Sequence, residues 1–438
     1  MAVDPITQFE LNRLRANNFQ RKSFKMKSAG VIANAPGNAN APGSAPIRTI
    51  RILYGLYNTP EAKVFEATIQ DGSLIRSAQV GATIQGANNP RPGVDNNGTY
   101  AIDSSMGYSV SLSKDGNIAA ISAPESYDSA YRFGYQIGNV KVYEYDGTSW
   151  SQKGSTLYGG ETADEVLVGT SVDLSDDGLK LLVQSSGPNT LDDGYSQAQS
   201  SYYVYEAGDW VLKSRPSFLF RYGYWAQMSN DGKVIMVTNP SEAWPSPGPK
   251  AFIFEYDSVN DSWSQRDSIA LGLKAGGNFD INNDGSIICV TVSKTLNSTM
   301  VKVFKWNGAS YDLMGTELGN LPYGTKNTLC RLNDAGDILV IGGNDRSSSI
   351  FSNHIYRWNG VSWVEDSISV IPGSFEINHT GDIIVGYDWK IFEYTNSNWT
   401  LVGQIDTGGE GPGRVRANDS SIGYPSLGGR FAVGFSEI

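Results

Sequence analysis

A motif of the form Gly-x-apolar-apolar-apolar recurs seven times along the 438 residues and constrains the fold more than any other feature. Most copies follow an acidic or Asn-containing turn, as in SDDGLKLLV and NNDGSIICV. Asp-Gly supplies the positive φ angles of a tight hairpin turn, and the apolar run predicts a strand covered on both faces. The glycines are spaced 45 to 62 residues apart, at Gly116, Gly178, Gly232, Gly285, Gly336, Gly381 and Gly429.

A second motif follows each of the first six copies and predicts a second hairpin. It consists of an apolar–aromatic pair, a polar turn and an aromatic residue, as in VYEYDGTSW (142–150) and IYRWNGVSW (355–363). Two hairpins make four strands, which is one blade of a β-propeller. The aromatic residue recurs at equivalent blade positions and is expected to pack between strands, as Trp150, Trp210, Trp263, Trp363 and Trp399.

The seventh copy of this second motif stands near the N-terminus, as VFEATIQDGSL (64–74), whereas residues 421–438 contain only the first hairpin. Both termini would then share one blade, which closes the ring and leaves no open sheet edge. We therefore predict an all-β protein, a seven-bladed β-propeller of four-stranded blades. Its last blade takes the inner two strands from the C-terminus and the outer two from the N-terminus.

The repeats also resemble those of a known group of proteins. Runs such as GYSVSLSKDGNIAAISAP (107–124) and VKVYEYDGTSWSQKGSTL (140–157) resemble the repeats of FG-GAP-like and WD-like β-propeller proteins of marine microbes, algae and large viruses. The resemblance covers residues 47–438 and is closest in the first full blade. Integrin-type FG-GAP repeats carry a calcium loop, whose acidic spacing most copies here lack. The resemblance therefore implies the fold but no bound metal.

The charge is unevenly distributed between an N-terminal arm and the rest of the chain. The net charge is −11, yet residues 1–30 hold six basic and two acidic residues. We predict three regions: a basic, partly helical arm at 1–28, an Ala/Pro/Gly/Asn linker at 29–46 and the propeller at 47–438. The acidic total argues against nucleic acid as a partner of the whole chain. A basic arm on an acidic body suggests that the arm has its own partner.

We interpret the arm as an anchor that contacts proteins of a larger assembly through residues 1–46, with a disordered tail as the alternative. Its anchoring candidates are Phe9, Leu14, Arg13, Arg15, Arg21, Lys22 and Lys25. No apolar run reaches the roughly 18 residues of a membrane span. The N-terminus lacks the apolar segment of a signal peptide, so synthesis in the cytoplasm is expected. Cys289 and Cys330 fall in strand-like runs and are expected to be buried free thiols.

Patterns that could bind a metal or catalyse a reaction are weak. Asp280-x-Asn282-x-Asp284-Gly285 reads like the start of a calcium loop, but its twelfth position is Thr291, and the pattern at Asp173 has Gln184 there. We therefore expect hairpin turns at both places, and no metal or cofactor. Only two histidines exist, and neither lies near a nucleophile signature. The sequence thus predicts that the chain is not an enzyme.

Aromatic residues in the longer connections are candidates for ligand binding. Exposed aromatic rings beside polar groups suit stacking on sugars or anchoring a protein interface, although each ring could instead cap a blade core. The candidates are Tyr131, Tyr135, Tyr222, Tyr224, Trp225, Trp244 and Trp389.

Together these features predict a non-enzymatic structural or interaction protein. The propeller would be anchored by its arm in a large assembly, chiefly a virion, as a capsid-associated, fibre or decoration protein. The viral assignment depends on the resemblance alone. One alternative is a carbohydrate-binding module or adhesin that binds glycans on the aromatic loop face. Another is a glycosidase-like enzyme, which requires two carboxylates converging on the central channel.

Overall fold

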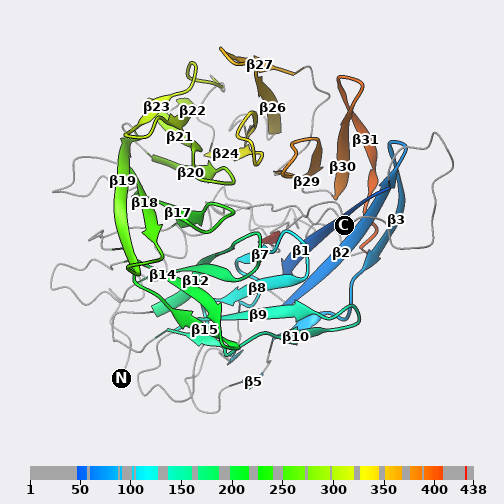
Figure 1. Cartoon of the computed structure of the whole chain (residues 1–438). Coiled ribbons are helices and arrows are strands. Elements are labelled where there is room, and N and C mark those ends of the chain that lie inside the picture. The colour runs from blue at the N-terminus through cyan, green and yellow to red at the C-terminus, as the bar shows by residue number, and fades with distance from the viewer. Residues whose placement is uncertain are drawn as a thin grey trace, which may run out of the picture.

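Seven antiparallel sheets stand around a common centre in the computed structural model (Figure 1), so the predicted seven-bladed propeller closed by both termini is confirmed. Most sheets have four strands, and no helix occurs among the described residues. The described residues therefore contain no helix that is long and apolar enough to cross a membrane. The described residues are 47–56, 60–86, 89–90, 101–102, 105–126, 137–159, 166–186, 198–216, 225–239, 250–271, 275–295, 298–319, 326–344, 351–366, 375–386, 389–407 and 430–431.

Six blades follow one another along the chain, each starting with its innermost strand. Blade 1 consists of β7 (Val110–Leu112), β8 (Ile118–Ala123), β9 (Asn139–Tyr145) and β10 (Trp150–Gln152), and β11 (Leu157–Tyr158) also pairs with β9. Blade 2 consists of β12 (Val166–Leu174), β13 (Lys180–Ser186), β14 (Ala198–Glu206) and β15 (Asp209–Leu212). Blade 3 consists of β16 (Trp225–Met228), β17 (Val234–Asn239), β18 (Lys250–Asp257) and β19 (Ser262–Ala270).

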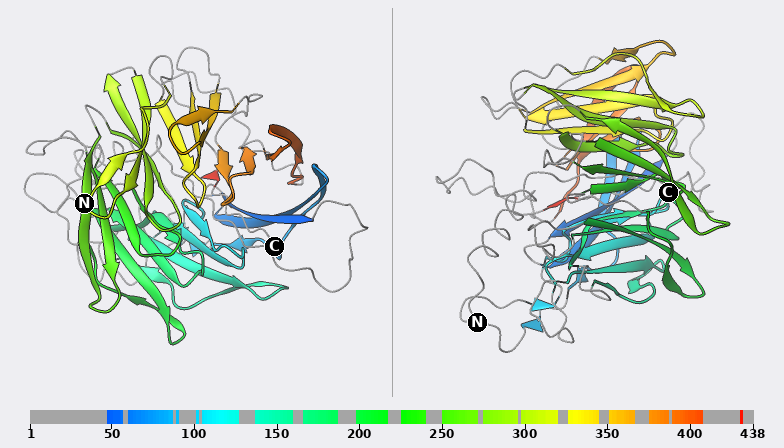
Figure 2. Two further views of the ribbon diagram at one scale, coloured as in Figure 1. Left: turned by 45° about the horizontal axis from the view of Figure 1, so that its top comes forward. Right: turned by 90° about the vertical axis from the view of Figure 1, so that its left-hand side faces the viewer.

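The next three blades repeat this order. Blade 4 consists of β20 (Ala275–Ile281), β21 (Ile287–Thr295), β22 (Ser298–Trp306) and β23 (Tyr311–Leu313). Blade 5 consists of β24 (Lys326–Leu332), β25 (Ile338–Asn344), β26 (Phe351–Trp358) and β27 (Trp363–Glu365). Blade 6 consists of β28 (Phe375–Ile377), β29 (Ile383–Gly386), β30 (Lys390–Thr395) and β31 (Asn398–Gln404). In the side view of Figure 2 a separate pair, β5 (Asn89–Pro90) and β6 (Ala101–Ile102), lies away from the blades.

Blade 7 combines both ends of the chain but divides them differently from the prediction. The N-terminal part supplies three strands, β1 (Arg48–Leu56), β2 (Glu61–Gln70) and β3 (Ser73–Gln79), and the C-terminal part supplies the inner β32 (Arg430–Phe431). β4 (Ile84–Gln85) also pairs with β2. β1 takes the second position because it is apolar on both faces: Ile52 and Leu53 are both fully buried. The predicted two-plus-two division is therefore wrong.

The hydrophobic core is divided into seven clusters, and each joins the facing sides of two neighbouring blades. Blade 7 packs against blade 6 through Ile52 and Trp389, among other residues. Beside this core, the Arg48 guanidinium of β1 binds both carboxylate oxygens of Asp382 at 3.0 Å and Glu393 at 3.1 Å. Cys289 and Cys330 are fully buried and free, as predicted, in the cluster between blades 4 and 5.

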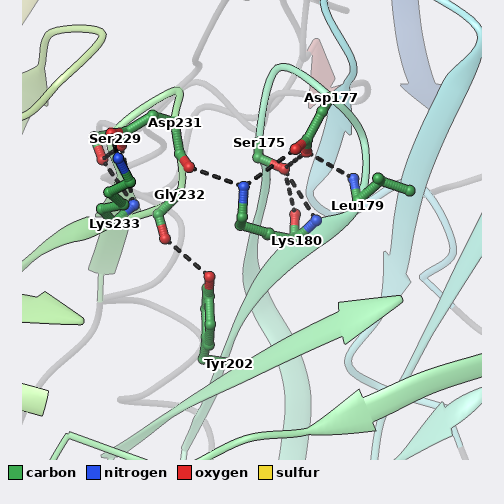
Figure 3. A network of polar contacts seen from close by, with 9 residues as sticks. All are labelled: Ser175, Asp177, Leu179, Lys180, Tyr202, Ser229, Asp231, Gly232 and Lys233. Carbon is green, nitrogen blue, oxygen red and sulfur yellow. Dashed lines mark hydrogen bonds and ion pairs between the residues drawn. The ribbon is translucent and has the colours of Figure 1, made fainter. Parts of the chain in front are cut away.

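Side-chain hydrogen bonds stabilise the Asp-Gly turns, and residues of these turns also contact the neighbouring blade. In blade 2, Asp177 Oδ1 accepts a hydrogen bond from the Leu179 N–H at 3.0 Å, and Lys180 Nζ reaches the Asp231 carbonyl of blade 3 at 3.0 Å (Figure 3). Gly285, with φ +72°, packs so closely that an added Cβ would lie 2.5 Å from Val234 Cβ of the preceding blade. Glycine is needed there both for its φ angle and for its lack of a side chain.

The recurring tryptophans of the outer strands join the blades at the rim. Four donate their indole N–H to a main-chain carbonyl of the preceding blade at 2.9 to 3.0 Å. The pairs are Trp150 with Val80, Trp210 with Lys153, Trp263 with Ser214 and Trp363 with Met314. Trp399 packs against Tyr394 with ring centroids 5.3 Å apart. The packing role predicted from their spacing is confirmed.

Candidate active site

Each inner strand of blades 1 to 6 carries a buried polar residue five positions before its turn glycine, between two apolar neighbours. The apolar neighbours pack into the cluster shared with the preceding blade, so the polar side chain faces the other way. All six side chains are at most 3% exposed. We call this set the axial ring: Ser111, Asp173, Gln227, Asp280, Arg331 and Glu376.

Three members of the axial ring satisfy the inner edge of the next blade. An innermost strand has main-chain N–H groups that no further strand can bind, and a buried N–H group without a partner is costly. Side-chain oxygens of the axial ring accept these hydrogen bonds at 2.8 to 2.9 Å. The pairs are Ser111 with the Leu174 N–H, Asp173 with the Met228 N–H and Asp280 with the Leu332 N–H.

Arg331 and Glu376 instead bind each other across blades 5 and 6. Arg331 Nε and Nη2 donate to the two oxygens of Glu376 at 2.9 and 3.1 Å, and Nη1 donates to the Cys330 carbonyl at 2.8 Å. Burial alone would lower the pKa of Arg331, but the charges of Glu376 and Asp280 raise it above its ordinary value. Blades 4 to 6 thus bring a second carboxylate close to a buried ion pair.

Gln227 also departs from the edge-capping pattern. Both atoms of its amide lack a hydrogen-bond partner among the described residues, although the residue is only 2% exposed. Its neighbours Ala226 and Met228 pack into the cluster with blade 2, so its side chain is directed toward blade 4. On the inner strand of blade 4, the Oδ1 atom of Asn278 is likewise buried without a partner there. Blades 3 and 4 therefore place unused hydrogen-bonding groups beside the axial ring.

The turn side of the axis is crossed by a polar network. Lys114 of blade 1 lies 3.5 Å from carboxylate oxygens of both Asp176 in blade 2 and Asp334 in blade 5. Asn230 of blade 3 donates to Asp334 at 2.7 Å. Because these residues come from four blades, their contacts bridge the centre of the ring on this side.

The two calcium-like patterns form hairpin turns, as expected from the sequence. Asn282 Oδ1 accepts the Ile287 N–H at 2.8 Å, and Asp284 Oδ1 accepts the Ser286 N–H at 2.9 Å. Hydrogen bonds from Leu179 and Lys180 hold the matching turn in blade 2. The described residues contain no group of three or more His, Cys, Asp or Glu side chains placed to bind a metal ion.

Of the ligand-binding residues predicted from the sequence, only Trp389 has a side chain that the structure describes. Tyr131, Tyr135, Tyr222, Tyr224 and Trp244 lie outside it, as do all seven anchoring candidates of the arm. Trp225 begins β16, but its side chain is not described. Trp389 is 1% exposed and packs edge-on against Tyr54 and Phe65, with centroids 5.2 and 5.4 Å away. It therefore lies in the core between blades 6 and 7, not on an exposed loop face.

The axial ring was missed because its members lie in six separate strands. The sequence patterns at Asp173 and Asp280 predict hairpin turns, and Gln227, Arg331 and Glu376 belong to no site motif. The available signal was a polar residue at a fixed distance before each turn glycine, inside an otherwise apolar strand. Aligning the repeats on that glycine would have revealed it.

No family model matches the chain, and no curated protein matches it significantly. Solved propellers match its fold. A protein of Bacteroides fragilis, provisionally named a 6-phosphogluconolactonase, is 11% identical with a TM-score of 0.52, over 82% of this chain and 96% of its own. A Bacteroides uniformis protein of the same provisional name has the same identity and score, over 82% and 97%. A Lactobacillus plantarum protein is 12% identical with a TM-score of 0.51, over 82% and 97%. At this identity the likeness shows the fold alone.

These comparisons contradict the function predicted from the sequence. The propellers that the chain resembles in fold include two that carry enzyme names. The fold therefore does not indicate a structural protein of a virion or an adhesin. The prediction that the chain is not an enzyme relied on the lack of a nucleophile signature. The lack of such a signature does not exclude an enzyme, because the residues of a site at a propeller axis come from separate strands. Membership of an FG-GAP-like or WD-like family, the protein partners and the location in the cell stay predictions.

Proposed function

We propose that the chain is a hydrolase of cyclic sugar esters, with its reaction centre at Asp280, Arg331 and Glu376. The observation that carries the proposal is a buried ion pair with a second carboxylate beside it. These charges occupy positions where an uncharged side chain is enough to accept the N–H groups of the neighbouring strand edge. Ser111 performs that capping in blade 1 with a hydroxyl group. Buried charges are costly, and they concentrate at functional sites. The provisional lactonase names of two structural neighbours point to the same class of reaction.

The three side chains suit the hydrolysis of a lactone. Asp280 acts as the general base that takes a proton from the attacking water, because Glu376 is held on both oxygens by Arg331. The Arg331 guanidinium stabilises the negative charge that develops on the carbonyl oxygen. Glu376 orients that guanidinium. The carbon–oxygen ester bond then breaks, and Asp280 returns the proton to the ring oxygen, which leaves as the hydroxyl group of a hydroxy acid.

The proposal is tested by measuring acid release from sugar lactones in a pH-stat with the full-length chain, after subtraction of spontaneous hydrolysis. Asp280→Asn keeps an oxygen that can accept the Leu332 N–H, so the fold is retained, but it removes the base. We expect kcat to fall by about 100-fold or more. Asp312→Asn changes an exposed carboxylate of the same blade and serves as the matched control. An unchanged kcat in Asp280→Asn, or a parent chain that hydrolyses no lactone, contradicts the proposal.

A further inference from the structure

The positive charges at the described part of the axis are already matched by carboxylates. Arg331 donates to both carboxylate oxygens of Glu376 and lies in the field of Asp280. Lys114 lies 3.5 Å from both Asp176 and Asp334. Counting Asp173, five carboxylates stand against two cations. A phosphate group requires cations or N–H groups that can turn toward it, so a dianionic substrate would meet net repulsion here.

The unused groups beside the axial ring are uncharged. The Gln227 amide offers two N–H donors and an acceptor oxygen, and Asn278 Oδ1 offers a second acceptor. A hydroxyl group both donates and accepts, so it satisfies an amide of this kind. These atoms have no partner among the described residues, and a buried polar group of this kind requires one, so a bound hydroxyl group is a suitable partner.

We infer that the substrate is an uncharged, polyhydroxylated lactone rather than a phosphorylated one, and that Gln227 binds one of its hydroxyl groups. This inference rests on the proposed lactone hydrolysis and specifies its substrate class. The argument combines two independent observations: the excess of carboxylates at the described part of the axis and the neutral donors and acceptors of blades 3 and 4.

The substrate class is tested by comparing D-glucono-δ-lactone with its 6-phosphate on the full-length chain. We expect kcat/KM to be at least about tenfold higher for the neutral lactone. An equal or higher value for the phosphorylated lactone overturns the inference and leaves the proposed hydrolysis intact. Calorimetry with the unreactive δ-lactam and its 6-phosphate separates binding from chemistry. If the neutral lactam binds and its 6-phosphate does not, yet no lactone is hydrolysed, the preference for an uncharged ligand stands and the proposed hydrolysis fails.

The role of Gln227 is tested with Gln227→Leu, which keeps the bulk and removes both hydrogen-bonding atoms. We expect KM for the neutral lactone to rise about tenfold while kcat changes little, because hydrogen bonds to a remote hydroxyl are uniform binding interactions. Gln265→Leu on the exposed outer strand of the same blade is the control. A higher melting temperature for Gln227→Leu with an unchanged KM would mean that the amide binds no substrate, and would overturn the assignment.

Discussion

Removing one partner of the Arg331–Glu376 pair should destabilise the propeller more than removing both. Each single variant, Arg331→Met or Glu376→Leu, leaves the remaining charge in a site that is at most 3% exposed. An uncompensated buried charge of this kind costs about 3–5 kcal/mol, whereas replacing the whole pair by apolar side chains is often neutral or stabilising. The double variant should therefore be within about 1 kcal/mol of the parent, far from the sum of the two losses.

The expected loss translates into a measurable shift in melting temperature. An unfolding entropy of about 2.1 cal/mol/K per residue gives roughly 0.8 kcal/mol/K for the propeller, so 3–5 kcal/mol lowers Tm by about 4 to 6 °C. Scanning calorimetry of the parent, the two single variants and the double variant gives the complete cycle.

Activity separates the structural role of the pair from its catalytic role. The double variant should be folded and stable but unable to hydrolyse a lactone, because no guanidinium remains to stabilise the oxyanion. Additive losses in the double variant would refute the account of a coupled buried pair. A stable double variant with the parent's kcat would refute the assignment of Arg331 to catalysis.

Two further predictions concern ring closure and the contacts between blades. Burial alone would raise the pKa of Asp382, but the hydrogen bonds and charge of Arg48 lower it below 3.8. Arg48→Gln should therefore cost about 2 kcal/mol at neutral pH. The difference from the parent should shrink as the pH falls from 3.8 through the lowered pKa of Asp382, because the carboxylate of the folded protein becomes protonated only there. A gap that stays constant in denaturant titrations down to pH 2.5 would contradict this. Gly285→Ala should cost about 2–4 kcal/mol by thermal unfolding, and Gly308→Ala about 1–2 kcal/mol. Both glycines have a positive φ, but an added Cβ would meet a neighbour within 4 Å only at Gly285. Equal losses of stability in the two variants would contradict the steric argument.

The strand pattern was predictable because it depends on local chemistry. Asp-Gly turns and apolar runs specify hairpins over a few residues, and counting them predicted seven blades and the sharing of one blade by both termini. The division of that blade was predicted wrongly, because the two half-motifs were assigned to the termini as intact hairpins. Burial on both faces of β1 places the strand inside the sheet, and this depends on the neighbouring blades rather than on turn residues.

The candidate site could not be predicted from the same local signals. Position five before the turn glycine is Ser111 in blade 1, Arg331 in blade 5 and Glu376 in blade 6, and each is an ordinary polar residue in its own segment. Trp389 illustrates the opposite error. Its position in a short loop suggested a ligand-binding residue, but its side chain lies in the core.

The sequence by itself determined the repeats, the blade number and the hairpin turns, because each is encoded in residues that are neighbours along the chain. Only the tertiary structure decided which residues share the axis. Asp280, Arg331 and Glu376 are separated by 45 to 51 positions and come together only because the blades curve around one centre. A ring brings equivalent positions of all its repeats to the same axis, so its site is a property of closure rather than of any single repeat.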